Sequence, residues 1–138
     1  MIYILLPAYN EEGSLSSLLT KICNVFTSLR KEYFLIVCDD GSQDKTGEIL
    51  KECARTMPIE ILAHKINRGL GETSRDLFER ASELSEDDDV IIRMDCDDTH
   101  EPKFFQEMLD KKNEGYDVVI ASRFQPKGGQ KGLNAHKT

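Results

Sequence analysis

Two carboxylates at the end of an apolar stretch are the residues best suited to chemistry in this sequence. Asp95 and Asp97 follow the mostly apolar residues 90–94, and Pro102 then opens a helical pattern. Residues 90–94 therefore predict a buried strand whose carboxyl end carries the two acids. In open α/β sheets the ligand crevice lies at that edge of the sheet. Two carboxylates so close together can share one hard divalent cation with phosphate oxygens, which favours a metal-assisted site for a nucleotide sugar.

Two further segments of the same kind precede these acids. The apolar residues 34–38 lead into Asp39 and Asp40 and then into a glycine turn. Such acids can act at a ligand crevice or can simply cap a turn. Residues 67–71 (Asn-Arg-Gly-Leu-Gly) open a helical pattern, and their glycines could let the backbone approach a phosphate or could form only a tight turn. Both interpretations stay open for each segment.

The elements that must position these residues alternate along the chain. Apolar stretches at 2–6, 34–38, 59–63, 90–94 and 118–121 predict strands, and helical patterns separate them. Asn10 is suited to the N-cap of the first helix, whose apolar face would be Leu15, Leu18, Leu19, Ile22, Phe26 and Leu29. The inner face of the third helix would be Leu70, Leu77, Phe78, Ala81 and Leu84. This alternation predicts an α/β fold, a Rossmann-like sandwich with a mostly parallel central sheet.

The end of the sequence differs from the rest. Residues 125–138 contain three glycines, three lysines and no apolar periodicity. We therefore expect a single nucleotide-sugar-binding domain over residues 1–124. Residues 125–138 would be a flexible or truncated connection to a missing C-terminal segment.

Composition excludes several classes of protein. The chain has 138 residues, of which 39% are hydrophobic and 31% charged, and its net charge is −7. This charge argues against nucleic acid as a partner, although an acidic protein can bind a polyanionic nucleotide through a metal. No apolar run approaches the roughly 20 residues that span a bilayer, and the N-terminal run is too short for a signal peptide. Cys23, Cys38, Cys53 and Cys96 are widely spaced, which favours reduced thiols in a cytoplasmic protein.

Five short motifs come in an order and spacing that resemble a known family. The sequence is similar to the family-two glycosyltransferases of GT-A fold, and most similar to the branch with dolichol-phosphate mannosyltransferase and polyprenyl-phosphate sugar transferases. The resemblance covers essentially residues 2–129. The motifs are Pro-Ala-Tyr-Asn-Glu at 7–11, Asp-Asp-Gly-Ser at 39–42, Asn-Arg-Gly-Leu-Gly at 67–71, Met-Asp-Cys-Asp at 94–97 and Ala-Ser-Arg at 121–123.

This resemblance implies sugar transfer from a nucleoside diphosphate sugar, such as GDP-mannose or a UDP-sugar, with inversion at the anomeric carbon. The acceptor would be a polyprenyl or dolichyl phosphate, and the enzyme would work in the cytoplasm or at the cytoplasmic face of a membrane. Membrane contact would come only through the acceptor or a missing segment. The implied site residues are Pro7, Tyr9 and Glu11 for the nucleoside, Asp40 for the base, Asp95, Cys96 and Asp97 as the Asp-x-Asp motif, and Arg123 for the donor phosphates.

Within that motif, Asp95 and Asp97 would hold Mg²⁺ or Mn²⁺ against the diphosphate, and the resemblance gives Asp97 and Arg123 catalytic roles. Asp98 and Thr99 depart from the residues common in the mannosyltransferase branch. Taken singly, Tyr9 could be a core-edge residue and Arg123 could form only a surface ion pair.

Three other functions need weighing. The chain could be a non-catalytic nucleotide-binding module, or its acceptor could be a saccharide. A phosphoryl-accepting receiver domain also carries acids on a parallel sheet. That fold needs paired acids after the first strand and a lysine after the fifth, where this sequence has Pro7 and Arg123, so we set it aside.

Overall fold

A parallel four-stranded sheet forms the centre of the N-terminal unit, which spans Met1–His100. The structure is a computed structural model and describes residues 1–95, 104–115, 118–122 and 132–136. The sheet order is β3-β2-β1-β4, and each neighbouring pair is parallel. Its strands are β1 (Ile2–Ala8), β2 (Tyr33–Asp40), β3 (Ile59–His64) and β4 (Val90–Arg93). The predicted α/β fold with a mostly parallel sheet is confirmed.

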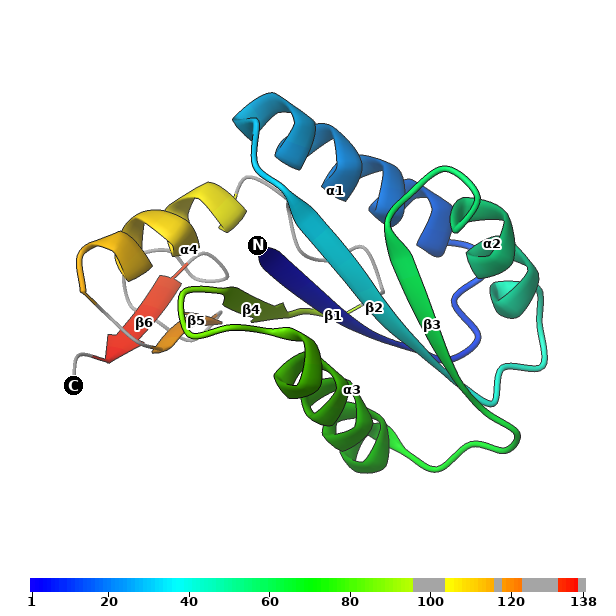
Figure 1. Cartoon of the computed structure of the whole chain (residues 1–138). Helices are drawn as coiled ribbons and strands as arrows, with labels where there is room; N and C mark the ends of the chain where they lie inside the picture. The colour runs from blue at the N-terminus through cyan, green and yellow to red at the C-terminus, as the bar shows by residue number, and fades with distance from the viewer. Residues whose placement is uncertain (96–103, 116–117, 123–131, 137–138) are drawn as a thin grey trace. The chain divides into compact units, whose positions relative to one another are not determined.

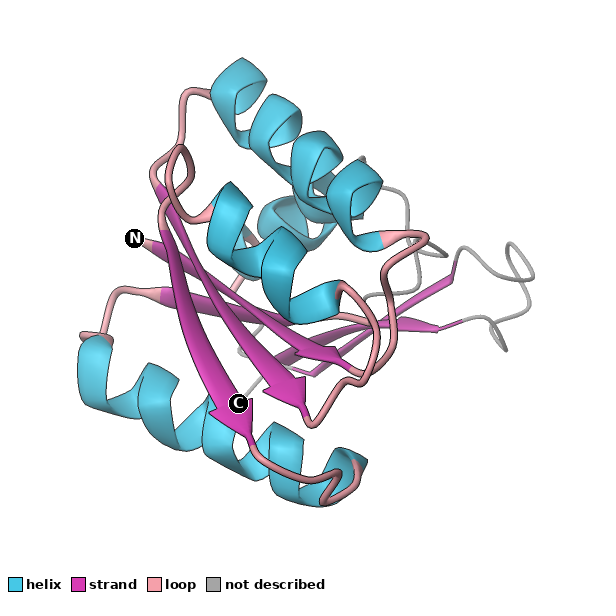
Figure 2. Ribbon diagram, turned by 90° about the vertical axis from the view of Figure 1, so that its right-hand side faces the viewer, coloured by secondary structure: helices cyan, strands magenta, loops and turns pink. Residues whose placement is uncertain are grey.

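The helices of this unit cover both faces of the sheet. Helices α1 (Leu15–Leu29) and α2 (Thr46–Cys53) lie on one face, and α3 (Leu70–Leu84) lies on the other (Figures 1 and 2). The chain moves outward from β1 through β2 to β3, and α3 then returns it to β4 on the far side of β1. The winding direction therefore reverses between β1 and β4. Open α/β sheets bind ligands at the carboxyl ends of the strands beside such a reversal.

Apolar side chains from the two inner strands and from α1 make up most of the core. The middle residues of β1 and β2 are fully buried, as expected for strands covered on both faces. The predicted apolar face of α1 is buried except for Leu29, which is half-buried. Phe26 stacks on Tyr33 with ring centroids 5.2 Å apart. Cys23, Cys38 and Cys53 are free, as the spacing predicted, and Cys96 lies outside the described residues.

The buried face of α3 differs from the prediction. Leu77 and Ala81 pack against the sheet as expected, but Leu70 and Phe78 are 60% and 46% exposed. Thr73, which is 1% exposed, lies on the buried face of α3 where we expected Leu70. Residues four apart share one side of a helix, so Thr73, Leu77 and Ala81 align. Phe78 comes one residue after Leu77 and is therefore turned away from the sheet.

The start of α1 also differs from the prediction. Asn10 is not its N-cap, because the helix begins at Leu15 and Ser14 precedes it. Asn10 has a left-handed backbone with φ of 51°, and its side-chain oxygen accepts a hydrogen bond from the Gln43 amide at 2.9 Å. An asparagine tolerates this backbone conformation and bonds nearby amides readily, so it serves here as a turn residue.

Strand β4 is less buried than predicted. Of its residues only Ile92 is buried, and Ile91 is 38% exposed. The physical reason is the place of β4 at the end of the strand order, where it pairs with β1 on one side.

The second unit, Glu101–Thr138, contains α4 (Phe104–Asn113), β5 (Val118–Ser122) and β6 (Gly132–His136). The fifth predicted strand therefore exists, but it pairs antiparallel with β6 in a two-stranded sheet. Residues 125–138, which we expected to be a flexible or truncated connection, include the strand β6. The sequence pattern did not predict β6, because it contains Gly132 and Asn134 and both residue types are uncommon in strands.

Candidate nucleotide site

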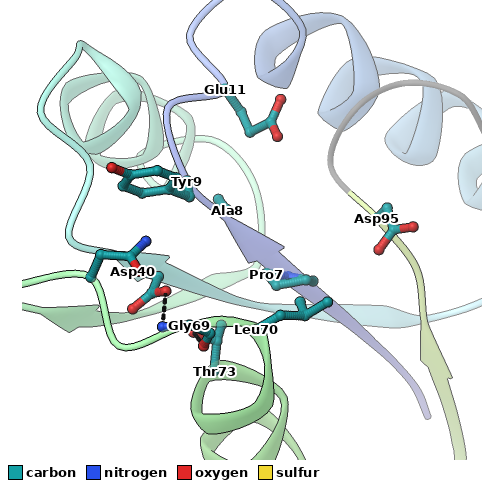
Figure 3. A pocket seen from close by; sticks show the side chains of 10 residues that line it. Pro7, Ala8, Tyr9, Glu11, Asp40, Gly69, Leu70, Thr73 and Asp95 are labelled. Carbon is teal, nitrogen blue, oxygen red and sulfur yellow. Dashed lines mark hydrogen bonds between the residues drawn. The ribbon is translucent and has the colours of Figure 1, made fainter.

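A cavity of about 410 Å³ opens at the carboxyl ends of β1, β2 and β4. Five of the predicted site residues line it, namely Pro7, Tyr9, Glu11, Asp40 and Asp95. In Figure 3, Tyr9 and Asp40 lie toward one end of the pocket and Asp95 toward the other. The pairing of β1 with β4 brings these ends together, since the Met94 amide donates to the Leu5 carbonyl at 3.1 Å. The predicted gathering of acids at one sheet edge is therefore observed for Asp40 and Asp95.

The glycine-rich turn before α3 forms another wall of the pocket. Asn67, Gly69, Leu70 and Thr73 line it together with Ala8. The backbone of Gly69 has φ of 94°, a conformation that favours glycine. Of the two interpretations of this segment, a turn is observed, and the turn also faces the pocket. Sequence reasoning did not name Ala8, Leu70 or Thr73 as site residues.

Hydrogen bonds join the loop after β1 to the loop after β2. The Asn10 amide donates to Ser42 Oγ at 3.0 Å, and the Glu11 amide donates to Thr46 Oγ1 at 2.9 Å. In return, the Lys45 amide donates to a carboxylate oxygen of Glu12 at 3.0 Å. Thr46 is fully buried. Because both loops are fixed to each other, Tyr9 and Glu11 have a defined place beside Asp40.

Asp40 is 4% exposed and is held by the turn before α3. Its two oxygens accept hydrogen bonds from the Arg68 amide at 2.8 Å and the Gly69 amide at 2.9 Å. The latter bond is drawn in Figure 3. Burial alone would raise the pKa of Asp40, but hydrogen bonds from His64 and these amides outweigh it and lower the pKa below 3.8. Asp40 is thus a buried anion, and its predicted contact with a base stays a prediction.

His64 lies behind the pocket and was missed by the sequence analysis. Its Nδ1 is 2.7 Å from Oδ1 of Asp40, and its Nε2 is 2.6 Å from Oδ2 of Asp76. The hydrogen bonds to Asp40 and Asp76 raise the pKa of His64 above 6.5, although burial opposes this. The contact between His64 and Asp40 could have been predicted, because β2 and β3 are neighbouring strands and Asp40 lies opposite His64 in their register. Nothing in the sequence pattern indicated Asp76.

Asp95 differs from Asp40 in its surroundings. Its side chain is 47% exposed, and one oxygen accepts a hydrogen bond from Arg93 at 3.2 Å. Carboxylate oxygens suit Mg²⁺ or Mn²⁺, so Asp95 fits the predicted metal role. Its predicted partner Asp97 lies outside the described residues, as do Cys96 and Arg123. Within the described ranges, no three His, Cys, Asp or Glu side chains gather as a metal site.

The remaining predicted nucleoside residues surround the open side of the pocket. Tyr9 is 45% exposed, which places its ring at the pocket and not in the core. Ser14 Oγ donates to the Glu11 carboxylate at 3.1 Å. None of the helices in the described part of the chain is both long and apolar enough to cross a lipid bilayer.

Comparison with known proteins agrees with this fold. Residues 1–349 of S. aureus TarS in complex with UDP superpose with a TM-score of 0.65 at 17% identity, covering 91% of this chain and 38% of that one. Glucosyl-3-phosphoglycerate synthase from Mycobacterium tuberculosis in complex with UDP gives 0.62 at 21% identity, covering 92% and 45%. At these identities the likeness shows the fold, which is the GT-A glycosyltransferase fold.

Sequence relatives are closer. The chain is 36% identical over 120 residues to undecaprenyl-phosphate 4-deoxy-4-formamido-L-arabinose transferase of Photorhabdus laumondii, covering 87% of this chain and 36% of the relative. It is 32% identical over 116 residues to the transferase of that name in Edwardsiella ictaluri, covering 84% and 35%. The chain thus spans about a third of the length of these curated relatives. The family model of glycosyl transferase family 2 matches residues 3–138, and the chain belongs to that family.

Proposed function

We propose that this chain carries the donor site of a glycosyltransferase that moves a sugar from a nucleoside diphosphate sugar to a polyprenyl phosphate. The observation that carries this proposal is the pocket at the sheet reversal, lined by Tyr9, Asp40 and Asp95. The names of the sequence relatives support an undecaprenyl phosphate acceptor. The two structural neighbours solved with UDP support uridine over guanosine in the donor. Because the acceptor is a membrane lipid, the enzyme would work at a membrane face.

The charges of the pocket support a metal requirement. The ionisable side chains that line it in the described residues are Tyr9, Glu11, Asp40 and Asp95, and none of them is a cation at neutral pH. His64 pairs with Asp40 and Arg93 pairs with Asp95, which leaves Glu11 as the lining carboxylate of the described residues that faces an incoming diphosphate without a positive partner. Like charges this close repel strongly when partly shielded from water. A diphosphate therefore needs a positive group here, and we infer that Asp95 and Asp97 supply it by holding Mg²⁺ or Mn²⁺.

When bound, such a cation would supply Lewis-acid stabilisation of the negative charge that grows on the leaving diphosphate. The chain's own residues would orient the donor. Tyr9 would offer its exposed ring to the base, and Arg123 would bind donor phosphate oxygens through its planar guanidinium. The fixed loops after β1 and β2 would keep the nucleoside in one place, so that the anomeric carbon faces the acceptor.

The proposed transfer inverts the anomeric centre. An oxygen of the acceptor phosphate forms a bond to the anomeric carbon from the side opposite the diphosphate, while the bond from that carbon to the diphosphate oxygen breaks. The electron pair leaves with the nucleoside diphosphate. A phosphate acceptor is already ionised near neutral pH, so no strong general base is needed.

Calorimetric titration of UDP and GDP into the chain, with and without Mn²⁺, tests the donor site. We expect UDP to bind only with Mn²⁺, and Asp95→Asn to weaken this binding at least about tenfold, since a metal ligand is lost. The control is Asp88→Asn, an exposed acid of the loop before β4. A UDP affinity that is the same with and without Mn²⁺ and in Asp95→Asn would contradict the metal site. Tighter binding of GDP than of UDP would contradict the uridine assignment.

Transfer itself needs a separate assay with undecaprenyl phosphate in detergent, UDP-sugars as donors and mass spectrometry of the lipid. Formation of a glycosyl phospholipid supports the proposal. Metal-dependent UDP binding without transfer would favour a nucleotide-binding module.

A further inference from the structure

A buried histidine joins two carboxylates behind the pocket and does not itself line it. The His64 side chain is 7% exposed, while those of Asp40 and Asp76 are 6% and 34% exposed. Asp40 ends β2, His64 ends β3 and Asp76 belongs to α3. The three side chains therefore tie the sheet edge to the helix that begins at the pocket.

Of these three residues, Asp40 is the one that lines the pocket. Its oxygens hold the Arg68 and Gly69 amides, and Gly69 is the residue before α3. Thr73 Oγ1 in turn donates to the Gly69 carbonyl at 2.9 Å. Gly69 and Thr73 both line the pocket. A displacement of Asp40 would thus release the backbone that forms one wall of the pocket.

Both ring nitrogens of His64 need a proton in this arrangement. Each nitrogen lies within 2.7 Å of a carboxylate oxygen, and a carboxylate only accepts hydrogen bonds. A neutral imidazole carries one proton and would turn a lone pair toward one of the two carboxylates. The geometry therefore suits the doubly protonated, positively charged imidazolium.

In the described part of the chain, the thiol of Cys38 also faces His64 and does not supply a competing charge. Cys38 Sγ lies 3.8 Å from Nε2. Burial first, and then the charges of Asp76, Asp40 and Asp39, raise the pKa of Cys38 to about 11, so it stays a neutral thiol. The charges that act on His64 at neutral pH are accordingly those of Asp40 on β2 and Asp76 on α3.

We propose, resting on the nucleotide role of the pocket, that His64 is a positioning residue whose imidazolium holds Asp40 and the Gly69 backbone in the shape that binds the nucleotide. When His64 loses its proton, one of its two hydrogen bonds is lost. The wall formed by Gly69 and Thr73 then loses its support. Nucleotide affinity should fall as the pH rises through the titration of His64. The hydrogen bonds to Asp40 and Asp76 raise the pKa of His64, which favours its charged form.

Asp76→Asn separates this role from simple packing. The amide oxygen of asparagine can still accept a hydrogen bond from His64, but the second negative charge is gone, so the pKa of His64 should fall. We expect UDP affinity, measured with saturating Mn²⁺ from about pH 6 to about pH 9, to drop roughly tenfold across the titration of His64. In Asp76→Asn the drop should occur at lower pH, with affinity near wild type at the acidic end. The matched control is Glu79→Gln, which removes an exposed ion pair with Arg75 on the same helix and should leave the pH profile unchanged.

A measurement without nucleotide keeps this proposal distinct from the proposed function. In NMR spectra of the free protein, the amide signals of Arg68 and Gly69 should titrate together with the ring signals of His64. His64→Gln, which cannot be charged, should remove this titration and flatten the pH profile of UDP binding. If UDP fails to bind the wild type, the donor-site proposal fails, and the two amides still decide whether His64 positions the wall. Amides that ignore the titration of His64, or identical pH profiles in wild type and Asp76→Asn, would overturn the proposal.

Discussion

Asp40 and Asp95 have the same place in the sequence pattern but different surroundings in the structure. Each lies at the carboxyl end of a mostly apolar strand and lines the pocket at that edge of the sheet. Asp40 is 4% exposed and is bound by His64 and two backbone amides, whereas the Asp95 side chain is 47% exposed beside Arg93. The comparison teaches that an acid at a strand end can have one of two roles. It can belong to the frame of the site, meaning the buried residues that hold the pocket walls in place, as Asp40 does. It can instead belong to the ligand surface, meaning the exposed side chains that can contact a ligand, as Asp95 does. Hydrogen bonds from the neighbouring loop decide which.

The largest effect on stability should come from Asp40→Asn. This change keeps the volume but leaves the buried His64 beside a neutral group and sets a side-chain amide near the Arg68 and Gly69 amides. Breaking a buried ion pair costs about 3–5 kcal/mol. Urea denaturation should show a loss of that order in the free energy of unfolding. A loss below about 1 kcal/mol would mean that Asp40 is not part of the frame.

Gly41→Ala tests the same loop through the backbone and should have the next largest effect. Gly41 has φ of 74°, and a Cβ there would lie 2.5 Å from the Asn67 nitrogen and the Ile66 carbonyl carbon. A left-handed backbone costs about 1–2 kcal/mol and overpacking about 1–3 kcal/mol, so the sum should be roughly 2–5 kcal/mol. Urea denaturation again measures it.

The control for Gly41→Ala is Gly71→Ala, because a Cβ at Gly71 meets nothing within 4 Å. Gly71 lies in the first turn of α3, where alanine should leave stability unchanged or raise it by up to about 1 kcal/mol. Equal losses in both variants would show that the turn does not pack on Gly41 as described.

The pH dependence of stability should follow His64 and Asp40, whose pKa values are shifted in the folded protein. A raised histidine pKa stabilises the fold fully below 6.5, its ordinary value, and this contribution is lost as the pH rises through the folded pKa. A lowered carboxyl pKa stabilises the fold above 3.8, and this contribution is lost as the pH falls through the folded pKa. Both contributions are present together between these two ordinary values.

Thermal unfolding measured at rising pH should therefore show a decline in stability as the pH passes through the folded pKa of His64. This decline should be smaller than the effect of Asp40→Asn, since one hydrogen bond of the neutral ring survives. His64→Gln should lose the decline, and Asp95→Asn should keep it. If the decline persists in His64→Gln, it is caused by another titratable group.

Much of the frame of this site could be predicted from the sequence. Apolar stretches located every strand of the parallel sheet, because strands buried between helices contain almost nothing else. The predicted gathering of Asp40 and Asp95 at one edge followed from parallel strands alone. The buried stripe of α3 was only partly predictable, since Leu70 and Phe78 satisfy a helical period without facing the sheet.

The rest depended on contacts between segments far apart in the sequence. The pairing of His64 with Asp76 needs the relative position of β3 and α3, which no local pattern contains. Asn10 looked like a helix cap because its partner, the Gln43 amide, lies across two loops. Strand β6 was missed because its residues have weak strand preference and its partner β5 supplies the order.

The smallest effect on stability should come from the ion pair of Asp95 with Arg93, which lies 3.2 Å apart with side chains 47% and 29% exposed. Exposed pairs contribute about 0–1 kcal/mol, so a double-mutant cycle of Asp95→Asn and Arg93→Met should give a coupling energy within that range. Loss of this ion pair should change metal-dependent nucleotide binding more than it changes stability, because Arg93→Met removes the positive neighbour that competes with a cation for Asp95. We expect this variant to bind UDP at lower Mn²⁺ concentration than the wild type, measured by calorimetry, with unfolding unchanged. A coupling energy as large as the cost of Asp40→Asn would place Asp95 in the frame and remove the difference between the two acids.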